Sequence, residues 1–316
     1  MQSEIDFVIT WVDGNDPVHK AKRKRWQSRV WQGESKDKEQ SVSDKRFVQH
    51  RELIYCLRSI KHHAPWYRKI WLVTDNQIPE FLDSDKLAED RIFVVDHTLL
   101  FKHHPDALPT FNTRAIVSQL DVIEGLSAQF IYGNDDFMFG SAVSQDFFFN
   151  QDKPVFWGDW QPGLPANKTT LFQQGMINAA RMVEADPGQF IHISHGFQPM
   201  DKDIIGKLKS CFTNEFANNV QHKFRHRSQF LVESLHNHYC YYKLMCPVAC
   251  TEPMVHFSFE LCREGTEEKV RFLLDLFKTG ERKMLCINEY QALVERMAFV
   301  EGELDTLCGP ALFSEH

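Results

Sequence analysis

The first half of the chain alternates short apolar runs with amphipathic stretches. Four short, largely apolar runs predict buried strands; they cover residues 6–12, 69–74, 91–96 and 129–132. Apolar residues at helical spacing predict helices over residues 47–62 and 112–123, the second beginning near Asn112 or Thr113 as its N-cap. Strands that alternate with helices indicate a parallel sheet with right-handed crossovers.

Beyond Gly140 the pattern becomes mostly helical. Helices are predicted over residues 170–183, 266–276 and 288–299. We therefore predict an α/β fold with a mainly parallel, Rossmann-like (GT-A-like) sheet and helices on both faces in residues 1–190. Residues 191–316 are predicted to form a mostly helical part of the same unit.

Two polar stretches follow the first predicted strand. Residues 18–31 are rich in basic side chains, namely Lys20, Lys22, Arg23, Lys24, Arg25 and Arg29. This stretch is compatible with contact with an anionic membrane surface or a polyanionic acceptor; a solvated helix face is the alternative. Residues 34–45 are polar and sparse in hydrophobic residues, which predicts a flexible loop.

Composition narrows the class of protein. The chain has 316 residues and a net charge of −7, which makes it a poor general binder of nucleic acids. It shows neither a signal peptide nor a run of about 18 apolar residues, so we expect a cytoplasmic protein without a membrane-spanning helix. Eight cysteines without a CxxC pair predict reduced thiols. A zinc site at Cys246 and Cys250 with His236 and His238 is a weaker alternative.

Paired carboxylates are the strongest local candidate for chemistry. Asn134, Asp135 and Asp136 follow the apolar run 129–132. Two adjacent carboxylates at a strand end suit a divalent cation that bridges diphosphate oxygens, because Mg²⁺ binds one or two carboxylates plus phosphates. A polar turn is the alternative interpretation.

Arginine and histidine supply further candidates. Arg51, Arg58, Arg68 and Arg114 could each bind phosphate through a planar fork of donors, or form surface ion pairs. His195 could accept a proton from a hydroxyl, and Arg225 could stabilise a transferring phosphoryl group. P-loop, dinucleotide-binding and GxSxG motifs do not occur, which argues against those enzyme classes.

Four ordered blocks of the sequence carry a family resemblance. They lie at residues 5–17, in segments of 51–140, at 195–200, and at 222–226 with the aromatic run 239–242. In this order they resemble the Stealth family. That family includes bacterial capsule and cell-surface polysaccharide phosphotransferases and the catalytic subunit of the lysosomal-enzyme N-acetylglucosamine-1-phosphotransferase.

The resemblance implies a reaction and a set of site residues. A sugar 1-phosphate would pass from a UDP-sugar to a hydroxyl of a glycan or lipid-linked polysaccharide acceptor, with release of UMP. Residues 1–190 would bind the nucleotide sugar, and residues 191–316 would complete the catalytic unit. The implied catalytic residues are Asp136, His195 and Arg225. Asp135 and Asp136 would hold Mg²⁺ or Mn²⁺, and the implied substrate- or nucleotide-binding residues are Asp13, Asn15, Arg58, Asn112 and Asn134.

Two other functions stay open on the sequence. A metal-dependent glycosyltransferase would use the same carboxylates but release UDP, and a carbohydrate-binding module would need none of the catalytic residues. The resemblance further implies work on capsular or exopolysaccharide chains, with peripheral contact at the inner face of the cell membrane. The donor sugar rests on a few hydroxyl contacts that the sequence does not identify.

Overall fold

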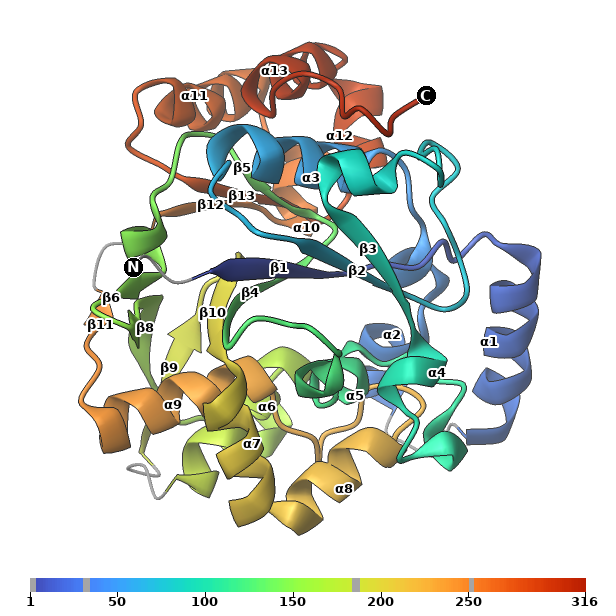
Figure 1. Ribbon diagram of the computed structural model, residues 1–316, viewed down its shortest axis with the longest axis vertical. Coiled ribbons are helices and arrows are strands. Elements are labelled where there is room, and N and C mark those ends of the chain that lie inside the picture. Colours follow the sequence, from blue (N-terminus) through green and yellow to red (C-terminus); the bar gives the residue numbers. More distant parts are fainter. Residues whose placement is uncertain (1–3, 31–34, 184–187, 250–252) are drawn as a thin grey trace.

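A five-stranded sheet forms the centre of the protein. A computed structural model describes residues 4–30, 35–183, 188–249 and 253–316. The strand order is β10-β4-β1-β2-β3 (Figure 1). The strands are β1 (Ile5–Thr10), β2 (Ile70–Thr74), β3 (Ile92–Asp96), β4 (Gln129–Asn134) and β10 (Gln198–Asp201). Only β10 pairs in the antiparallel sense, so the predicted mainly parallel α/β sheet is confirmed.

The register brings four strand ends to one edge of this sheet. Thr10 lies opposite Asn134 on one side and Val73 on the other, and Thr74 lies opposite Asp96. Because these strands run in the same direction, the loops that follow them meet along one line. Ligands of open α/β sheets bind at this edge.

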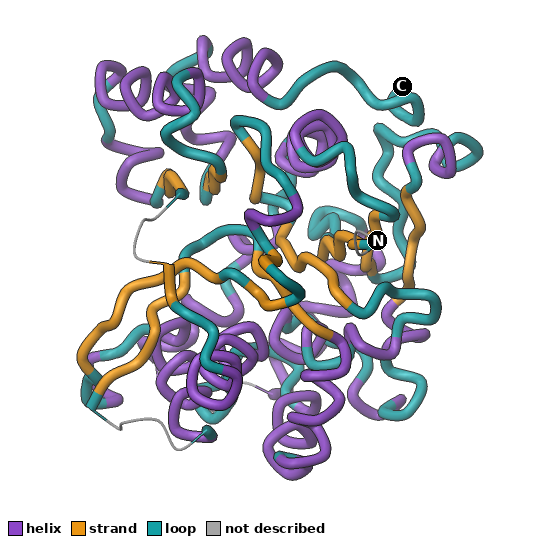
Figure 2. The backbone as a smooth tube through the Cα atoms, turned by 60° about the vertical axis from the view of Figure 1, so that its left-hand side comes forward, coloured by secondary structure: helices purple, strands orange, loops and turns teal. Residues whose placement is uncertain are grey.

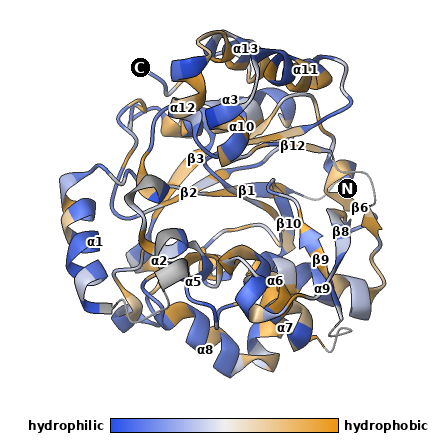
Figure 3. Ribbon diagram, turned by 180° about the vertical axis from the view of Figure 1, so that it is seen from behind, coloured by the Kyte–Doolittle hydropathy of each residue, from blue (hydrophilic) through white to orange (hydrophobic). Residues whose placement is uncertain are grey.

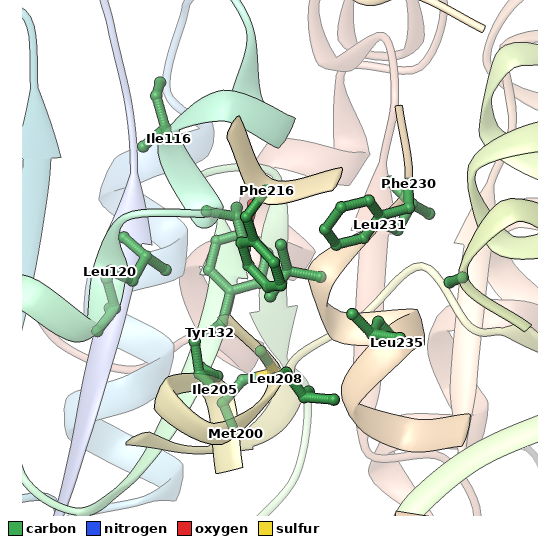
Figure 4. Packing of buried hydrophobic residues seen from close by; sticks show 14 of the residues in the cluster. Ile116, Leu120, Tyr132, Met200, Ile205, Leu208, Phe216, Phe230, Leu231 and Leu235 are labelled. Atoms are coloured by element: carbon green, nitrogen blue, oxygen red, sulfur yellow. The ribbon is translucent and has the colours of Figure 1, made fainter. Parts of the chain in front are cut away.

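One face of the sheet packs against a large helical layer. The helices are α5 (Thr113–Val117), α6 (Leu171–Met182), α7 (Lys202–Cys211), α8 (Thr213–Gln221) and α9 (Val232–Leu244). Figure 4 shows Tyr132 and Met200 of the sheet meeting Ile116, Phe216 and Leu235 of these helices. The layer encloses the largest apolar cluster of the described residues.

The opposite face is covered by α3 (Glu52–His63), and further helices pack above it (Figure 1). These are α10 (Phe259–Glu264), α11 (Glu267–Lys278), α12 (Tyr290–Arg296) and α13 (Phe299–Leu307). They flank a small sheet of β12 (Met254–Phe257), β13 (Met284–Ile287) and β5 (Phe137–Phe139). Helices therefore cover both faces of the central sheet, as predicted.

Smaller elements border the sheet. A side sheet of β8 (Phe156–Pro162), β9 (Gln189–Ile193) and β11 (Val248–Ala249) stands beside the pair β6 (Phe149–Asn150) and β7 (Lys153–Pro154) (Figures 1 and 2). Next to the strand ends lie α1 (Pro17–Val30), α2 (Ser35–Val42) and α4 (His97–Leu100), and α1 is mostly hydrophilic (Figure 3). Short 3₁₀ turns are η1 (Asp44–Phe47), η2 (Leu87–Asp90), η3 (Pro105–Ala107), η4 (Leu120–Val122), η5 (Gln145–Phe147) and η6 (Ala166–Lys168).

Two local predictions need correction. The loop predicted for residues 34–45 is wrong, because α2 and η1 lie there. The polar side chains of α2 have distant partners: Asp37 pairs with Arg227, and Ser41 donates to the carbonyl of Arg225 at 2.8 Å. The helix predicted from residue 47 begins at Glu52, and the mostly helical second part also supplies β10, β12 and β13.

The second part of the chain therefore adds a strand to the central sheet. The division at residue 190 stays a prediction. In the described ranges, no helix combines the length and apolar character needed to cross a bilayer.

Candidate active site

Loops at the carboxyl edge of the sheet are tied to one another. Gln77, after β2, accepts from the Asp13 backbone N–H at 2.9 Å and donates to the Asp13 carbonyl at 3.0 Å. The Asp13 carboxylate in turn accepts from the Asn15 N–H at 2.8 Å. After β4, the Asn134 side-chain oxygen accepts from Thr10 at 3.2 Å and Tyr132 at 2.8 Å. These bonds fix the loops between which a substrate would lie.

Three carboxyl groups influence one another beside the end of β4. Burial, followed by the charge of Glu52, raises the pKa of Asp136 to about 6. Burial, followed by the charges of Asp136 and Glu52, raises the pKa of Asp135 well above its usual value. Asp136 Oδ2 accepts from the Cys286 thiol at 3.6 Å, whereas the buried Oδ1 has no partner among the described residues. Such a group favours a bound proton or cation.

Two arginines lie within electrostatic range of Asp136. Burial lowers the pKa of Arg225, which feels the opposing charges of Glu233 and Asp136. Burial, then repulsion from Arg225 and Arg114, holds the pKa of Arg46 well below its usual value. Arg46 as a whole residue is exposed to solvent, although its charged group is surrounded by protein. Neighbouring guanidinium groups are favourable where an anion binds between them.

Asn112 holds the loop that carries Arg225. Its fully buried amide nitrogen donates to the carbonyls of His222 at 2.9 Å and Phe224 at 3.0 Å, and to Gln229 Oε1 at 3.0 Å. Its oxygen caps α5 by accepting from the Arg114 N–H at 3.2 Å. All these polar contacts lie within the protein, so the structure gives Asn112 a positioning role instead of the expected substrate contact.

His195 joins the same site. Its ring stacks on Phe172 with centroids 4.4 Å apart, and the His256 ring lies 4.6 Å away. Burial, followed by repulsion from His256, His192 and Arg225, lowers the pKa of His195 to about 3. The imidazole is therefore neutral at pH 7. The charge of Arg225 influences the pKa values of both His195 and Asp136, so the three predicted catalytic residues lie within electrostatic range of Arg225.

The other arginines named from the sequence have protein partners. Arg58 donates to Glu315 at 2.8 Å and to Asp305 at 3.1 Å, so the structure does not bring it to this site. Arg51 pairs with Glu301 at 2.6 Å, and Arg68 donates to Asp6 at 2.8 Å. Arg114 donates to the carbonyls of His226 and Leu171, and burial lowers its pKa to about 9. In each case the arginine binds protein groups where the sequence offered a phosphate as its candidate partner.

Sequence reasoning missed four members of the site. Glu52 resembles an ordinary acidic residue in a helix first turn, and Arg46 follows a polar segment taken as a loop. Glu233 lies between the two segments of the fourth block, 222–226 and 239–242, and His256 lies beyond that block. In the local sequence, each of them is a polar residue beside apolar ones. Many surface residues have the same pattern, so it does not identify a site residue.

The donor set fits magnesium better than zinc. Over the described ranges, no three or more His, Cys, Asp or Glu side chains form a group able to hold a metal ion. Mg²⁺ needs only one or two carboxylates when phosphates and water complete its shell. Asp135 and Asp136, with the unpartnered Oδ1, meet that need. In the zinc alternative, Cys250 lies outside the described residues, and His236 and His238 accept backbone N–H groups at 3.1 and 3.0 Å.

Family models match the part of the chain that builds this edge. The description "Stealth protein CR1, conserved region 1" matches residues 3–29, and "Stealth protein CR2, conserved region 2" matches residues 46–156. The chain belongs to the Stealth family. The two Stealth regions hold the loop after β1, Glu52, Asn112 and both aspartates. His195 and Arg225 lie outside them.

Curated relatives carry phosphotransferase names. An exopolysaccharide phosphotransferase of Streptomyces coelicolor is 35% identical over 75% of this chain and 25% of its own length. Exopolysaccharide phosphotransferase CpsY of Mycobacterium tuberculosis is 34% identical over 77% of this chain and 44% of its own. Capsular polysaccharide phosphotransferase fcs1 of Haemophilus influenzae is 28% identical over 90% of this chain and 78% of its own length. This Stealth chain thus spans a quarter to a half of the first two relatives.

Among solved structures, the galactosyltransferase LgtC in complex with donor and acceptor sugar analogues matches with a TM-score of 0.42 and 10% identity. The match covers 96% of this chain and 97% of LgtC. The fold class of the Stealth chain rests on its own sheet order.

Proposed function

We propose that this Stealth protein transfers a sugar 1-phosphate from a UDP-sugar to a hydroxyl of a glycan acceptor, releasing UMP. The observation that carries the proposal is that the charge of Arg225 acts on both the Asp136 carboxyl group and the neutral His195 imidazole. The names of the relatives support a role in capsular or exopolysaccharide synthesis.

The chemistry divides among the residues as follows. A ring nitrogen of neutral His195 accepts the proton of the acceptor hydroxyl. The acceptor oxygen then bonds to the phosphorus that carries the sugar, and the bond from that phosphorus to the UMP oxygen breaks. Arg225 and Arg46 hold the transferring phosphoryl oxygens, where negative charge develops.

Asp135 and Asp136 would hold the divalent cation. Mg²⁺, or Mn²⁺ in its place, supplies positive charge to the diphosphate when bound. Glu52 keeps a third negative charge close to both aspartates, which strengthens their preference for a cation. Asp136 is also the second candidate for the acceptor's proton.

Contact with an anionic membrane surface is part of the proposal. Helix α1 carries exposed Lys24, Arg25 and Arg29 and no acidic residue. Each basic residue near an anionic surface contributes about 1 kcal/mol. A lipid-linked acceptor would then be presented beside the strand ends.

The nucleotide product tests the reaction. Purified protein is incubated with Mg²⁺, a panel of UDP-sugars and an acceptor glycan, and the released nucleotide is identified by chromatography. Acceptor-dependent UMP supports sugar-phosphate transfer, and the productive donor identifies the sugar. UDP would mean glycosyl transfer, and the absence of any product with every donor and acceptor would favour a binding role.

A further inference from the structure

A cavity of about 770 Å³ lies at the ends of β2 and β3, outside the catalytic cluster. Ligand pockets in proteins have volumes of about 300–1,000 Å³. Its walls come from α1, the loop after β2, the start of α4 and the segment around Pro109. The residues used here are Ala21, Lys22, Trp26, Asp75, His97 and Leu108.

His97 is a polar group of this cavity that lacks protein partners. It is 2% exposed, and neither ring nitrogen has a hydrogen-bond partner within the described part of the chain. Burial lowers its pKa to about 4 although Asp75 and Asp96 oppose the shift. A neutral imidazole therefore offers one donor and one acceptor, both unused, and such atoms are costly to bury.

The nearby carboxylates already have partners. Asp75 pairs with Lys22 at 3.1 Å. The Asp96 carboxylate accepts from the N–H groups of Thr98 at 2.8 Å and Asn76 at 2.5 Å. His97 is consequently a buried polar side chain of this wall that a ligand could still satisfy; the exposed Arg25 also lines the cavity.

The sheet sets the separation between the cavity and the catalytic aspartates. The order β4-β1-β2-β3 places the loop after β1 between them. With neighbouring strands about 4.8 Å apart, β4 and β2 are separated by about 10 Å. A ribose and a phosphate linkage can cover such a gap, so a diphosphate at Asp135 and Asp136 would direct the base of its nucleotide toward the cavity.

We propose that this cavity binds the nucleobase of the nucleotide donor and that His97 determines specificity by hydrogen bonding to the base edge. Trp26 and Leu108 supply apolar walls for the base faces. This hydrogen bond would require the imidazole to rotate about its Cβ–Cγ bond, because both ring nitrogens are buried in the structure. The assignment rests on the proposed function, because it takes the donor to be a nucleotide sugar.

Binding of UMP without acceptor tests the assignment independently of turnover. Calorimetry should show UMP binding to the wild type, and His97→Ala should raise the Kd by about tenfold, the effect of one hydrogen bond. The matched control is His103→Ala, which removes an exposed imidazole from the same connection and should leave the Kd within twofold.

Ala21→Trp provides a second variant, since it fills the cavity from an exposed helix position. It should abolish UMP binding without lowering Tm. A Kd unchanged within twofold in both His97→Ala and Ala21→Trp would overturn the assignment.

Photo-crosslinking with 5-iodo-UMP locates the base directly. We expect labelled peptides from residues 17–30 or 97–109, and a label on residues 195–233 would overturn the assignment. If UMP binds and labels the cavity but UDP is the product, the reaction proposal fails and the base site stands. If UMP is the product but the label lies elsewhere, only the base site fails.

Discussion

Buried charge distinguishes the residues of the site from those of the surrounding core. Asp136 keeps a carboxyl group where burial and Glu52 oppose ionisation, and His195 keeps an imidazole where burial and His256 oppose protonation. Neither arrangement stabilises the folded protein by itself. Groups with displaced pKa values concentrate where function requires them.

Replacement of Asp136 by Asn should separate stability from activity. A raised folded pKa means that the ionised carboxylate destabilises the fold, so the wild type loses stability as pH rises from about 4 to about 6. Above that window, Asp136→Asn should raise Tm and lower turnover by at least roughly 10²-fold. Thermal unfolding and UMP release at pH 7.5 measure both effects.

The control for this variant is Asp146→Asn, at an exposed carboxylate, which should change neither quantity. A lower Tm for Asp136→Asn, or retained turnover, would contradict the assigned environment and role.

Protonation of the buried carboxylates should set the pH dependence of kcat/KM. We expect kcat/KM to fall below about pH 6 as Asp136 takes up a proton, whereas His195 stays neutral until about pH 3. Glu52→Gln should move this acid limb to lower pH, because it removes the negative charge that, after burial, raises the pKa of Asp136. A pH–rate profile of both proteins tests this, and a limb unmoved by Glu52→Gln would count against the influence of Glu52 on Asp136.

At the scale of elements, the shape of the site depends on close contact between the loop after β1 and the turn η1. A Cβ added at Gly14 would lie 2.0 Å from the Phe47 carbonyl oxygen. Since the obstacle is backbone, Gly14→Ala must push apart the two segments that carry Asp13 and Arg46. We expect a lower Tm and lower turnover from this single methyl group.

Gly206 in α7 offers the matched control, since a Cβ there meets nothing within 4 Å. Gly206→Ala should stabilise the protein by about 0.5–1 kcal/mol, because alanine is the better helix former. Denaturant unfolding and turnover of both variants provide the comparison. Equal stability of the two would show that the loop and η1 are not in contact.

Elements that depend on neighbouring residues in the sequence were predictable. Elements that depend on contacts with residues far along the chain were not. Apolar runs in the sequence predict the four parallel strands. The start of α6 is likewise local, because Thr170 and Gln173 form a capping box there. By contrast, α2 depends on partners such as Arg227, 190 residues from Asp37. The same difference applies to the site: Asp136 follows its strand directly, whereas the neighbourhood of Arg46 and Glu233 exists only after folding.

At the scale of the whole molecule, ion pairs join α3 to α13 and to the C-terminal segment. Arg58 holds Glu315 near the end of the described chain and Asp305 on α13. The side chains of Arg58 and Glu315 are only 11% and 9% exposed. Removal of one partner from a buried pair costs about 3–5 kcal/mol, because the other charge stays uncompensated.

Arg58→Ala should therefore lower the free energy of unfolding by about 3 kcal/mol, while the KM for the donor stays unchanged. Substrate binding by Arg58 would give the opposite pattern, with a raised KM and an almost unchanged Tm. A double-mutant cycle with Glu315→Ala separates the pair from its surroundings, since the double variant should lose less stability than the sum of the single ones. Donor kinetics and denaturant unfolding of the same four proteins thus decide whether Arg58 joins α3 to α13 and the C-terminal segment or serves the active site.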